Sequence, residues 1–506
     1  IQRIRGFGSM RAMPLILITN KHAGHISKIS QELRKSNLNL EDINALIIDD
    51  EADNASLNTA KDKDSDFSAS AIYKSIKSLR NNLERHTVAQ YTATPQAVLL
   101  ISKKDHYSPE WARVISPGDQ YIGAKDLFFS NSPFCCTVPP NEITSARHIN
   151  DLALPKSFVS ALCSYLLSSA QRLHTPKLFH KKNSTFMVHP DIYNVTHDHW
   201  YKIISEKIDL WLQEIESNID NFFQENLNDF LKEYKNLKKS CMKTNIQIAS
   251  FDKLFYVYVP RIIQELQIIK VNKDSKKINW KIPHNILIGG YMLDRGYVVE
   301  GLVTTYMPRG KGGGMIDSLQ QRGRFYGYKK KYLGFLKTWM SKETIKAYKS
   351  YAKHEAHLYG TLDKLSKEGK DLREWERILL LDKGLIPCRK NVMGIGLKKD
   401  YTHGGGWYYP THPIAGNEKN KILFESIITH YKNEFKPFFI KDVDTTLWTD
   451  ARSALEVRNK NLGSILEVLR RYDPGEFDEG RFATSKMILG LLHDRGFKAS
   501  IILTGT

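Results

Sequence analysis

Four carboxylates lie within five positions, directly after a short apolar run near the N-terminus. The run Leu46–Ile48 predicts a buried strand, and Asp49, Asp50, Glu51 and Asp53 follow it in the stretch LIIDDEAD. Phosphoryl transfer needs one carboxylate to hold Mg²⁺ and a second group to orient the attacking water. We therefore assign Asp50 to the metal and Glu51 to the water. Asp49 replaces Asp50 as the metal ligand if the register is off by one, and an acidic turn after a strand is the simpler alternative.

A second candidate motif is TATP, Thr92 to Pro95, which follows a predicted strand at Val88–Tyr91. The hydroxyls of Thr92 and Thr94 are suited to link a nucleotide site to a facing part of the molecule. The motif is weak by itself, because Thr and Pro are common after strands. We assign both threonines to cofactor binding.

A third motif, NILIGGYMLDRGYVVEGL, begins with a predicted strand at Asn285–Ile288 and a glycine turn. Asp294, Arg295 and Gly296 follow this turn. An arginine-glycine pair at such a place is suited to sense a nucleotide across a cleft, and we assign the three residues to cofactor binding. A surface ion pair beside a turn explains the same residues equally well.

The fourth motif, QQRGRFYGY, starts with Gln320 and Gln321 and places Arg322 and Arg324 on either side of a glycine. An arginine finger stabilises charge on a transferring phosphoryl group and contributes roughly 10³–10⁵ in rate. Arg324 is our first choice for this role and Arg322 the second. The two glutamines are assigned to cofactor binding.

The order of these four motifs is more specific than any one of them, and it matches one family. The chain resembles the Z1-domain proteins, which are helicase-like ATPases of bacterial restriction and phage-defence systems. The stretches YIGAKDLFF, from Tyr121, and NSTFMVH, from Asn183, add to the resemblance. In all it covers approximately Pro14 to Leu333.

This resemblance implies a superfamily 2 ATPase in which two RecA-like lobes enclose ATP and Mg²⁺. It gives Asp50 and Glu51 the metal and the water, and Arg324 the contact across the cleft. It also implies double-stranded DNA as a partner, with methyltransferase or nuclease subunits of a defence system as further partners. Family members have been labelled endonucleases, and that activity rests here on the family alone.

Two features depart from the family pattern. The phosphate-binding loop, G-x-x-x-x-G-K-[ST], is missing, because the glycines near Arg5 have no Lys-Ser or Lys-Thr pair after them. We therefore expect an N-terminally truncated chain that does not hydrolyse ATP alone. Gly327 stands where many helicases place a further arginine, which weakens the case for strong unwinding.

The elements that must position these residues alternate between strands and helices, which predicts an α/β fold with parallel strands. Ligands of such sheets lie beyond the carboxyl ends of the strands. Leu15–Asn20 predicts a buried strand, and the apolar spacing from Trp200 to Leu237 predicts one long or two consecutive helices. Two further helices are expected at Leu455–Arg471 and Ser485–His493. We expect a partial first RecA-like lobe at 1–135, a second lobe at 150–340 with a helical insertion at about 196–275, and a helix-rich region at 341–506.

The net charge of +19 implies a polyanionic partner, and nucleic acid is the first candidate. The run Lys329–Lys331 is either a contact to nucleic-acid phosphates or a solvated basic turn. The five cysteines include no C-x-x-C pair, which favours reduced thiols and a cytoplasmic location, and no apolar run of 18 residues predicts a membrane span. The stretch His197–His199 resembles a metal-ligand cluster, but its place at a predicted helix start favours a surface or capping role.

Two other functions fit the same sequence. The chain could be an endonuclease that carries its own cutting site and uses a helicase-like fold to load on DNA. It could also be a nucleotide-sensing scaffold that binds partner subunits without net hydrolysis. DNA cleavage without ATP would favour the first, and ATP turnover that depends on Glu51 would exclude the second.

Overall fold

The computed structural model describes the chain from residue 16 to residue 504, apart from several gaps. The chain divides into two compact units, residues 1–395 and 396–506, and each is considered by itself. The gaps are 37–39, 60–69, 130–131, 146–153, 180–181, 192, 273–277, 295–298, 309–313, 374, 376–384, 387, 389–416, 440–452, 474–485, 487–488, 491 and 494–495.

The centre of the first unit is a six-stranded sheet in which every neighbouring pair is parallel. This confirms the predicted mixed α/β class. The central strands β5 and β8 are buried along their whole length, as the apolar run TFMV predicts for a sheet covered on both faces. In spatial order the strands are β4 (Cys135–Thr137), β11 (Lys337–Met340), β8 (Leu302–Met307), β5 (Ser184–Val188), β7 (His284–Gly289) and β6 (Leu266–Val271).

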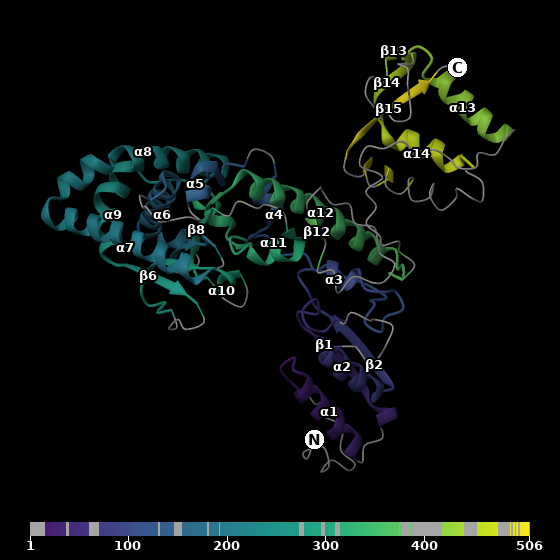
Figure 1. Ribbon diagram of the computed structural model, residues 1–506, viewed down its shortest axis with the longest axis horizontal. Helices are drawn as coiled ribbons and strands as arrows, with labels where there is room; N and C mark the ends of the chain where they lie inside the picture. The colour runs from purple at the N-terminus through teal and green to yellow at the C-terminus, as the bar shows by residue number, and fades with distance from the viewer. Residues whose placement is uncertain are drawn as a thin grey trace. The chain divides into compact units, whose positions relative to one another are not determined.

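A group of helices packs beside this sheet, and the predicted helical insertion is part of it. The apolar spacing after Trp200 forms two helices rather than one, α7 (Asn194–Ser217) and α8 (Ile219–Lys243). Helices α6 (Lys156–His174) and α7 contact the sheet, and α8 and α9 (Val259–Gln264) pack against these two helices (Figure 1). Trp200 and Trp211 are fully buried in this core. Short helical turns stand between these elements: α5 (Pro140–Ser145), η3 (Pro176–Leu178) and η4 (Lys253–Tyr258).

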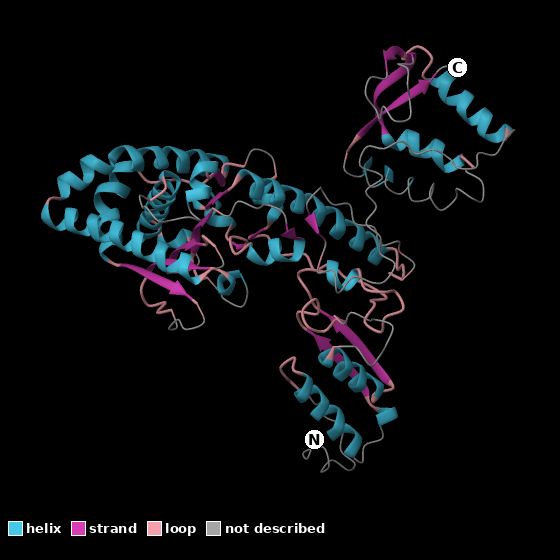
Figure 2. Ribbon diagram, viewed as in Figure 1, coloured by secondary structure: helices cyan, strands magenta, loops and turns pink. Residues whose placement is uncertain are grey.

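A smaller α/β part precedes this sheet. Strands β1 (Asn44–Asp49) and β2 (Arg85–Gln90) form a parallel pair. They are accompanied by α1 (Ala23–Lys35), η2 (Leu40–Asp42), α2 (Ala71–Asn81) and α3 (Gln96–Leu99) (Figure 2).

The predicted burial of two apolar runs in this part is wrong. The described residues of the run Leu15–Asn20 form no strand, and Ile18 is 94% exposed. Leu46 and Ile48 are on a strand as predicted, but they are 63% and 61% exposed. For Leu46 and Ile48 the physical reason is that, among the described residues, β1 pairs only with β2, and one face of this pair is uncovered.

Several elements join the two parts of the first unit. Strand β3 (Tyr121–Ile122) pairs with β10 (Gly327–Tyr328), and β9 (Gly314–Met315) pairs with β12 (Leu385–Ile386). The helical elements here are α4 (Ala124–Phe128), α10 (Tyr291–Asp294), α11 (Ile316–Arg322), η5 (Lys330–Phe335) and α12 (Lys342–Lys367).

The described residues of the second unit include a three-stranded antiparallel sheet and two helices with defined bounds. Its strands are β13 (Lys436–Phe439), β14 (Ser453–Asn461) and β15 (Lys498–Thr504), and its helices are α13 (Glu418–His430) and α14 (Leu462–Arg471). The predicted helix Leu455–Arg471 is therefore wrong in its first half, where the residues belong to β14. Asn461 ends that strand and caps the helix by accepting a hydrogen bond from Gly463 N. Across the described residues of the chain, no helix is long and apolar enough to cross a membrane.

Candidate functional site

The acidic loop, residues Asp49 to Asn54, leaves the carboxyl end of β1 and folds back on the end of β2. Two main-chain hydrogen bonds fasten it there, from Tyr91 N to Asp49 O (2.8 Å) and from Ala52 N to Tyr91 O (3.0 Å). The carboxylates of Asp49 and Asp53 are buried, whereas Asp50 and Glu51 are exposed. The loop thus presents to solvent the two carboxylates that the sequence assigns to metal and water.

Lys21, which the sequence analysis did not single out, neutralises the buried carboxylate of Asp49. Its Nζ lies 2.7 Å from Asp49 Oδ1. The same oxygen accepts a hydrogen bond from Ser56 Oγ at 3.1 Å. With two donors already on Oδ1, Asp49 is the less accessible of the two metal ligands considered, and Asp50 is the more accessible.

The residues present fit a magnesium ion held mainly by a bound phosphate. Mg²⁺ in nucleotide sites is typically bound through one or two carboxylates, with phosphates and waters completing the shell. Among the described residues, the exposed Asp50 carboxylate accepts a hydrogen bond from Glu51 N at Oδ1 (3.0 Å), which leaves Oδ2 for a cation. Within the described part of the chain, no three His, Cys, Asp or Glu side chains gather into a metal site of their own.

The TATP motif is bonded to the acidic loop by a side chain. Thr92 Oγ1 donates to Asp53 Oδ1 at 2.7 Å and accepts a hydrogen bond from Thr94 N at 2.9 Å. Thr94 itself is buried. The hydroxyl of Thr92 is therefore engaged by the acidic loop, and the predicted contact of both threonines with a nucleotide stays a prediction.

The link from TATP to the facing elements runs through a main-chain carbonyl. Ala93 O accepts hydrogen bonds from Gln320 Nε2 on α11 (2.6 Å) and from the Tyr359 hydroxyl on α12 (2.9 Å). Burial raises the pKa of Tyr359 to about 12, so its phenol keeps the proton that it donates. The amide oxygens of Gln320 and Gln321 are buried and accept no hydrogen bond from protein.

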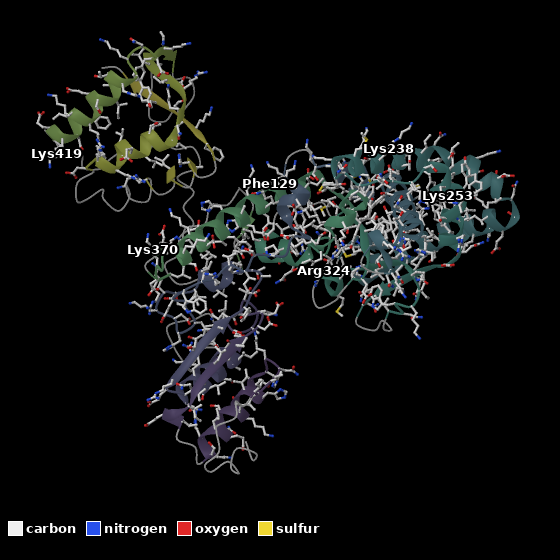
Figure 3. All side chains as sticks on the ribbon, turned by 180° about the vertical axis from the view of Figure 1, so that it is seen from behind. Phe129, Lys238, Lys253, Arg324, Lys370 and Lys419 are labelled. Atoms are coloured by element: carbon white, nitrogen blue, oxygen red, sulfur yellow. The ribbon has the colours of Figure 1, made fainter. Side chains whose placement is uncertain are left out.

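Arg324 is held on the short loop that follows α11, and Figure 3 labels it there. Its Nε donates to Leu293 O in α10, at 3.1 Å. This contact joins the arginine motif to the third motif. Arg322 ends α11 two residues earlier, and both arginines are half-buried.

The stretch YIGAKDLFF, which the resemblance included without assigning it a role, supports this loop. Ile122 pairs with Gly327 and Tyr121 with Tyr328, in an antiparallel register. The ring of Phe128 lies 5.7 Å from that of Phe325, the residue after Arg324. Two elements far apart in the sequence therefore fix the backbone that carries the arginine.

The structure gives a backbone reason for Gly327. Its φ is 130°, a conformation that side-chain-bearing residues rarely adopt. An arginine at this position would be strained, so the glycine is required by the turn between Arg324 and β10.

The basic run that follows does not lie wholly at the surface. Lys330 and Lys331 are exposed, but Lys329 is buried and its Nζ donates to Arg324 O at 3.2 Å. Burial lowers the pKa of Lys329 to about 7. Neither a phosphate contact nor a solvated turn therefore describes Lys329.

The third motif is only partly described. Asp294 ends α10, with its side chain outside the described residues, and Arg295 and Gly296 are also outside them. Gly290 is needed before this helix, because a Cβ there would stand 2.7 Å from Asp191 O and 3.0 Å from His197 Cε1. The glycine thus lets α7 approach the carboxyl end of β7.

The stretch His197–His199 has structural contacts at this same edge. His197 is buried with Nε2 2.8 Å from Asp191 O, and Asp198 forms an ion pair with Lys270 at 2.6 Å. Burial lowers the pKa of His197, so its ring is neutral near pH 7.

The fold and the site define a mixed α/β protein whose polar motifs gather at strand ends. Residues 157–379 match the family model of the Z1 domain, so this part of the chain is similar to that family. The match covers the arginine motif, α12 and five of the six strands of the sheet. No curated protein and no solved structure matches the chain.

Proposed function

We propose that this chain is part of a DNA-directed ATPase of the superfamily 2 helicase type, with two RecA-like lobes. The observation that carries the proposal is a hydrogen-bonded path between the acidic loop and the arginine motif. It runs from Asp53 to Thr92, and then from Ala93 to Gln320. Arg322 and Arg324 follow Gln320 within four residues.

In this proposal each motif has one task. Bound Mg²⁺ would neutralise charge on the phosphates of ATP. Asp50 holds the cation, and Glu51 orients the attacking water. Gln320 and Gln321 bind the nucleotide, and Asp294, Arg295 and Gly296 have the same task by their assignment from the sequence. Arg324 stabilises the charge that develops on the transferring phosphoryl group. Arg322 takes this role if Arg324 keeps its hydrogen bond to Leu293 O in α10.

The charge distribution supports a polyanionic partner. Residues 276–340 contain twelve Lys and Arg but three Asp and Glu. This one stretch therefore supplies nearly half of the net charge of +19. A basic excess of this kind favours nucleic-acid phosphates as partners, and affinity for them falls steeply with salt.

The test is ATP hydrolysis by the full product of the coding sequence, with and without double-stranded DNA. Glu51→Gln should lower kcat by at least about 100-fold with little change in KM. Arg324→Ala should lower kcat by roughly 10³-fold or more. Glu84→Gln and Arg261→Ala remove the same groups from exposed positions outside the site and should leave the rate unchanged.

Other outcomes would separate the rival functions. DNA cleavage with Mg²⁺ and no ATP, unaffected by Glu51→Gln, would replace the ATPase proposal with an endonuclease. ATP binding without turnover in the full-length protein would support a nucleotide-sensing scaffold. DNA-stimulated turnover that survives Glu51→Gln would remove the assigned chemistry altogether.

A further inference from the structure

The Lys21 ammonium lies inside a cage of four oxygen atoms, all supplied by the acidic loop. Besides Asp49 Oδ1 at 2.7 Å, it donates to the main-chain carbonyls of Asp50 (2.6 Å), Glu51 (2.9 Å) and Asn54 (3.3 Å). Lys21 belongs to none of the four motifs, and it precedes α1 by two residues. An ammonium has three protons to donate, so the cage engages all of its donor capacity.

The cage fixes a backbone conformation that the loop would not adopt easily by itself. Glu51 has a φ of 53°, in the left-handed region that residues with a Cβ avoid. The carbonyls of Asp50 and Glu51 both point to the ammonium, and Asn54 N closes the turn on Glu51 O at 2.8 Å. With the carbonyls turned inward, the side chains of Asp50 and Glu51 are left exposed.

The distances in the cage fit an ammonium and not a magnesium ion. Mg²⁺ binds oxygen at about 2.0–2.1 Å, whereas N–H···O hydrogen bonds have heavy-atom distances of about 2.7–3.2 Å. A magnesium ion at the loop must therefore bind on the other, exposed side, at Asp50.

From these contacts we propose that Lys21 is a positioning residue of the acidic loop. Its ammonium acts as a built-in cation that neutralises Asp49 and turns the carbonyls inward, so that Asp50 and Glu51 face the nucleotide side. The catalytic part of this inference rests on the proposed ATPase function, but the ordering of the loop does not.

The experiment has one readout for each part. Hydrogen–deuterium exchange of this chain without nucleotide reports loop order, through the amides of Ala52 and Asn54. Lys21→Met should speed their exchange by about tenfold or more, because both amides lose the structure that protects them. Lys28→Met, on the exposed face of α1, removes the same charge without touching the loop and should leave exchange unchanged. Unchanged exchange in Lys21→Met overturns the proposal.

A second pair of variants separates positioning from simple charge balance. Lys21→Met combined with Asp49→Asn removes the buried charge imbalance but leaves the carbonyls without their donor. The double variant should fold and still exchange faster than the wild type, which also keeps the test open if Lys21→Met alone does not fold. Exchange at the wild-type rate in the double variant would reduce Lys21 to a counter-ion and overturn the proposal.

The catalytic readout uses the full-length protein. Lys21→Met should lower kcat for ATP by about tenfold to 100-fold while KM stays within about twofold, because positioning acts on the chemical step. If kcat/KM falls only because KM rises, the result contradicts a positioning role for Lys21. If the wild type hydrolyses no ATP but exchange responds as described, the ATPase proposal fails and the ordering role of Lys21 stands.

Discussion

The phenol of Tyr359 donates a hydrogen bond to the main-chain carbonyl of Ala93, 266 positions earlier in the chain, at 2.9 Å. Gln320 donates to the same oxygen. One carbonyl thus receives a donor from α11 and another from α12. Because α11 also carries Arg322, this pair of contacts ties the position of the arginine motif to the TATP loop.

Tyr359→Phe should weaken the connection between the TATP loop and α12 without abolishing the connection to α11. One hydrogen bond contributes about 0.5–1.5 kcal/mol to stability, and Gln320 still satisfies the carbonyl. Combining Tyr359→Phe with Gln320→Ala should cost more than the two single changes together, since the carbonyl then has neither donor. Urea denaturation measures the cost. Tyr256→Phe is the control, because this exposed tyrosine makes no hydroxyl hydrogen bond with the described residues.

Thr92→Val should destabilise the acidic loop. The change keeps the side-chain shape but takes one hydrogen bond from the buried carboxylate of Asp53 and another from Thr94 N. A hydrogen bond to a charged group is worth about 1.5–3 kcal/mol, and a loss of that order is expected in denaturant unfolding. Thr92→Ser retains the hydroxyl and should recover most of it. Equal stability of the valine and serine variants would contradict the hydrogen bond from Thr92 to Asp53.

Two glycines should respond to alanine in opposite directions. Gly301 has a φ of 62°, and a Cβ there would stand 1.9 Å from Asn183 O, so Gly301→Ala should cost at least about 2 kcal/mol. Gly360 is inside α12 with open space at its Cβ position, so Gly360→Ala should stabilise by about 0.5–1 kcal/mol. Thermal denaturation of both variants checks the pair, and a stable Gly301→Ala would refute the close approach.

The buried ammonium of Lys329 should make stability depend on pH. Its folded pKa of about 7 lies below the unfolded value of 10.5, so between these values the unfolded chain binds more protons. The burial penalty is fully present below pH 7 and is relieved as pH rises toward 10.5, with a slope of up to about 1.4 kcal/mol per pH unit. Lys329→Met should remove this rise between pH 7 and 9, measured by denaturation. Lys330→Met, at an exposed position, should preserve it.

The sequence predicted those elements whose apolar pattern is long or regular. The helices after Trp200 were found from their apolar spacing, and strand β7 was found because burial on both faces needs continuous apolar residues. Strand β11 was missed, because its residues KTWM include a lysine. That lysine, Lys337, is buried and donates to Pro133 O and to Ser240 Oγ. Only tertiary contacts reveal that this charge can be accommodated in a sheet.

The sequence predicted the motifs of the candidate site but not the residues that hold these motifs in place. Asp50, Glu51 and Arg324 could be named because their chemistry is legible from residue type and spacing. Lys21 and Tyr359 lie outside every motif, and a lone lysine or tyrosine carries no signal of its partner. For Lys21 the one available hint was its place directly after an apolar run and a turn-former, at the edge where the carboxylates were expected.

The edge strand β4 has a practical consequence for anyone who divides this protein. Its residues 135–137 pair with β11, yet they precede the Z1 match at residue 157. The folded sheet therefore begins earlier in the sequence than the part that matches the family model. A piece cut at residue 157 would leave β11 as a bare edge, open to pairing with other molecules, whereas a piece that begins ahead of Tyr121 keeps both β4 and the strand beside the arginine loop.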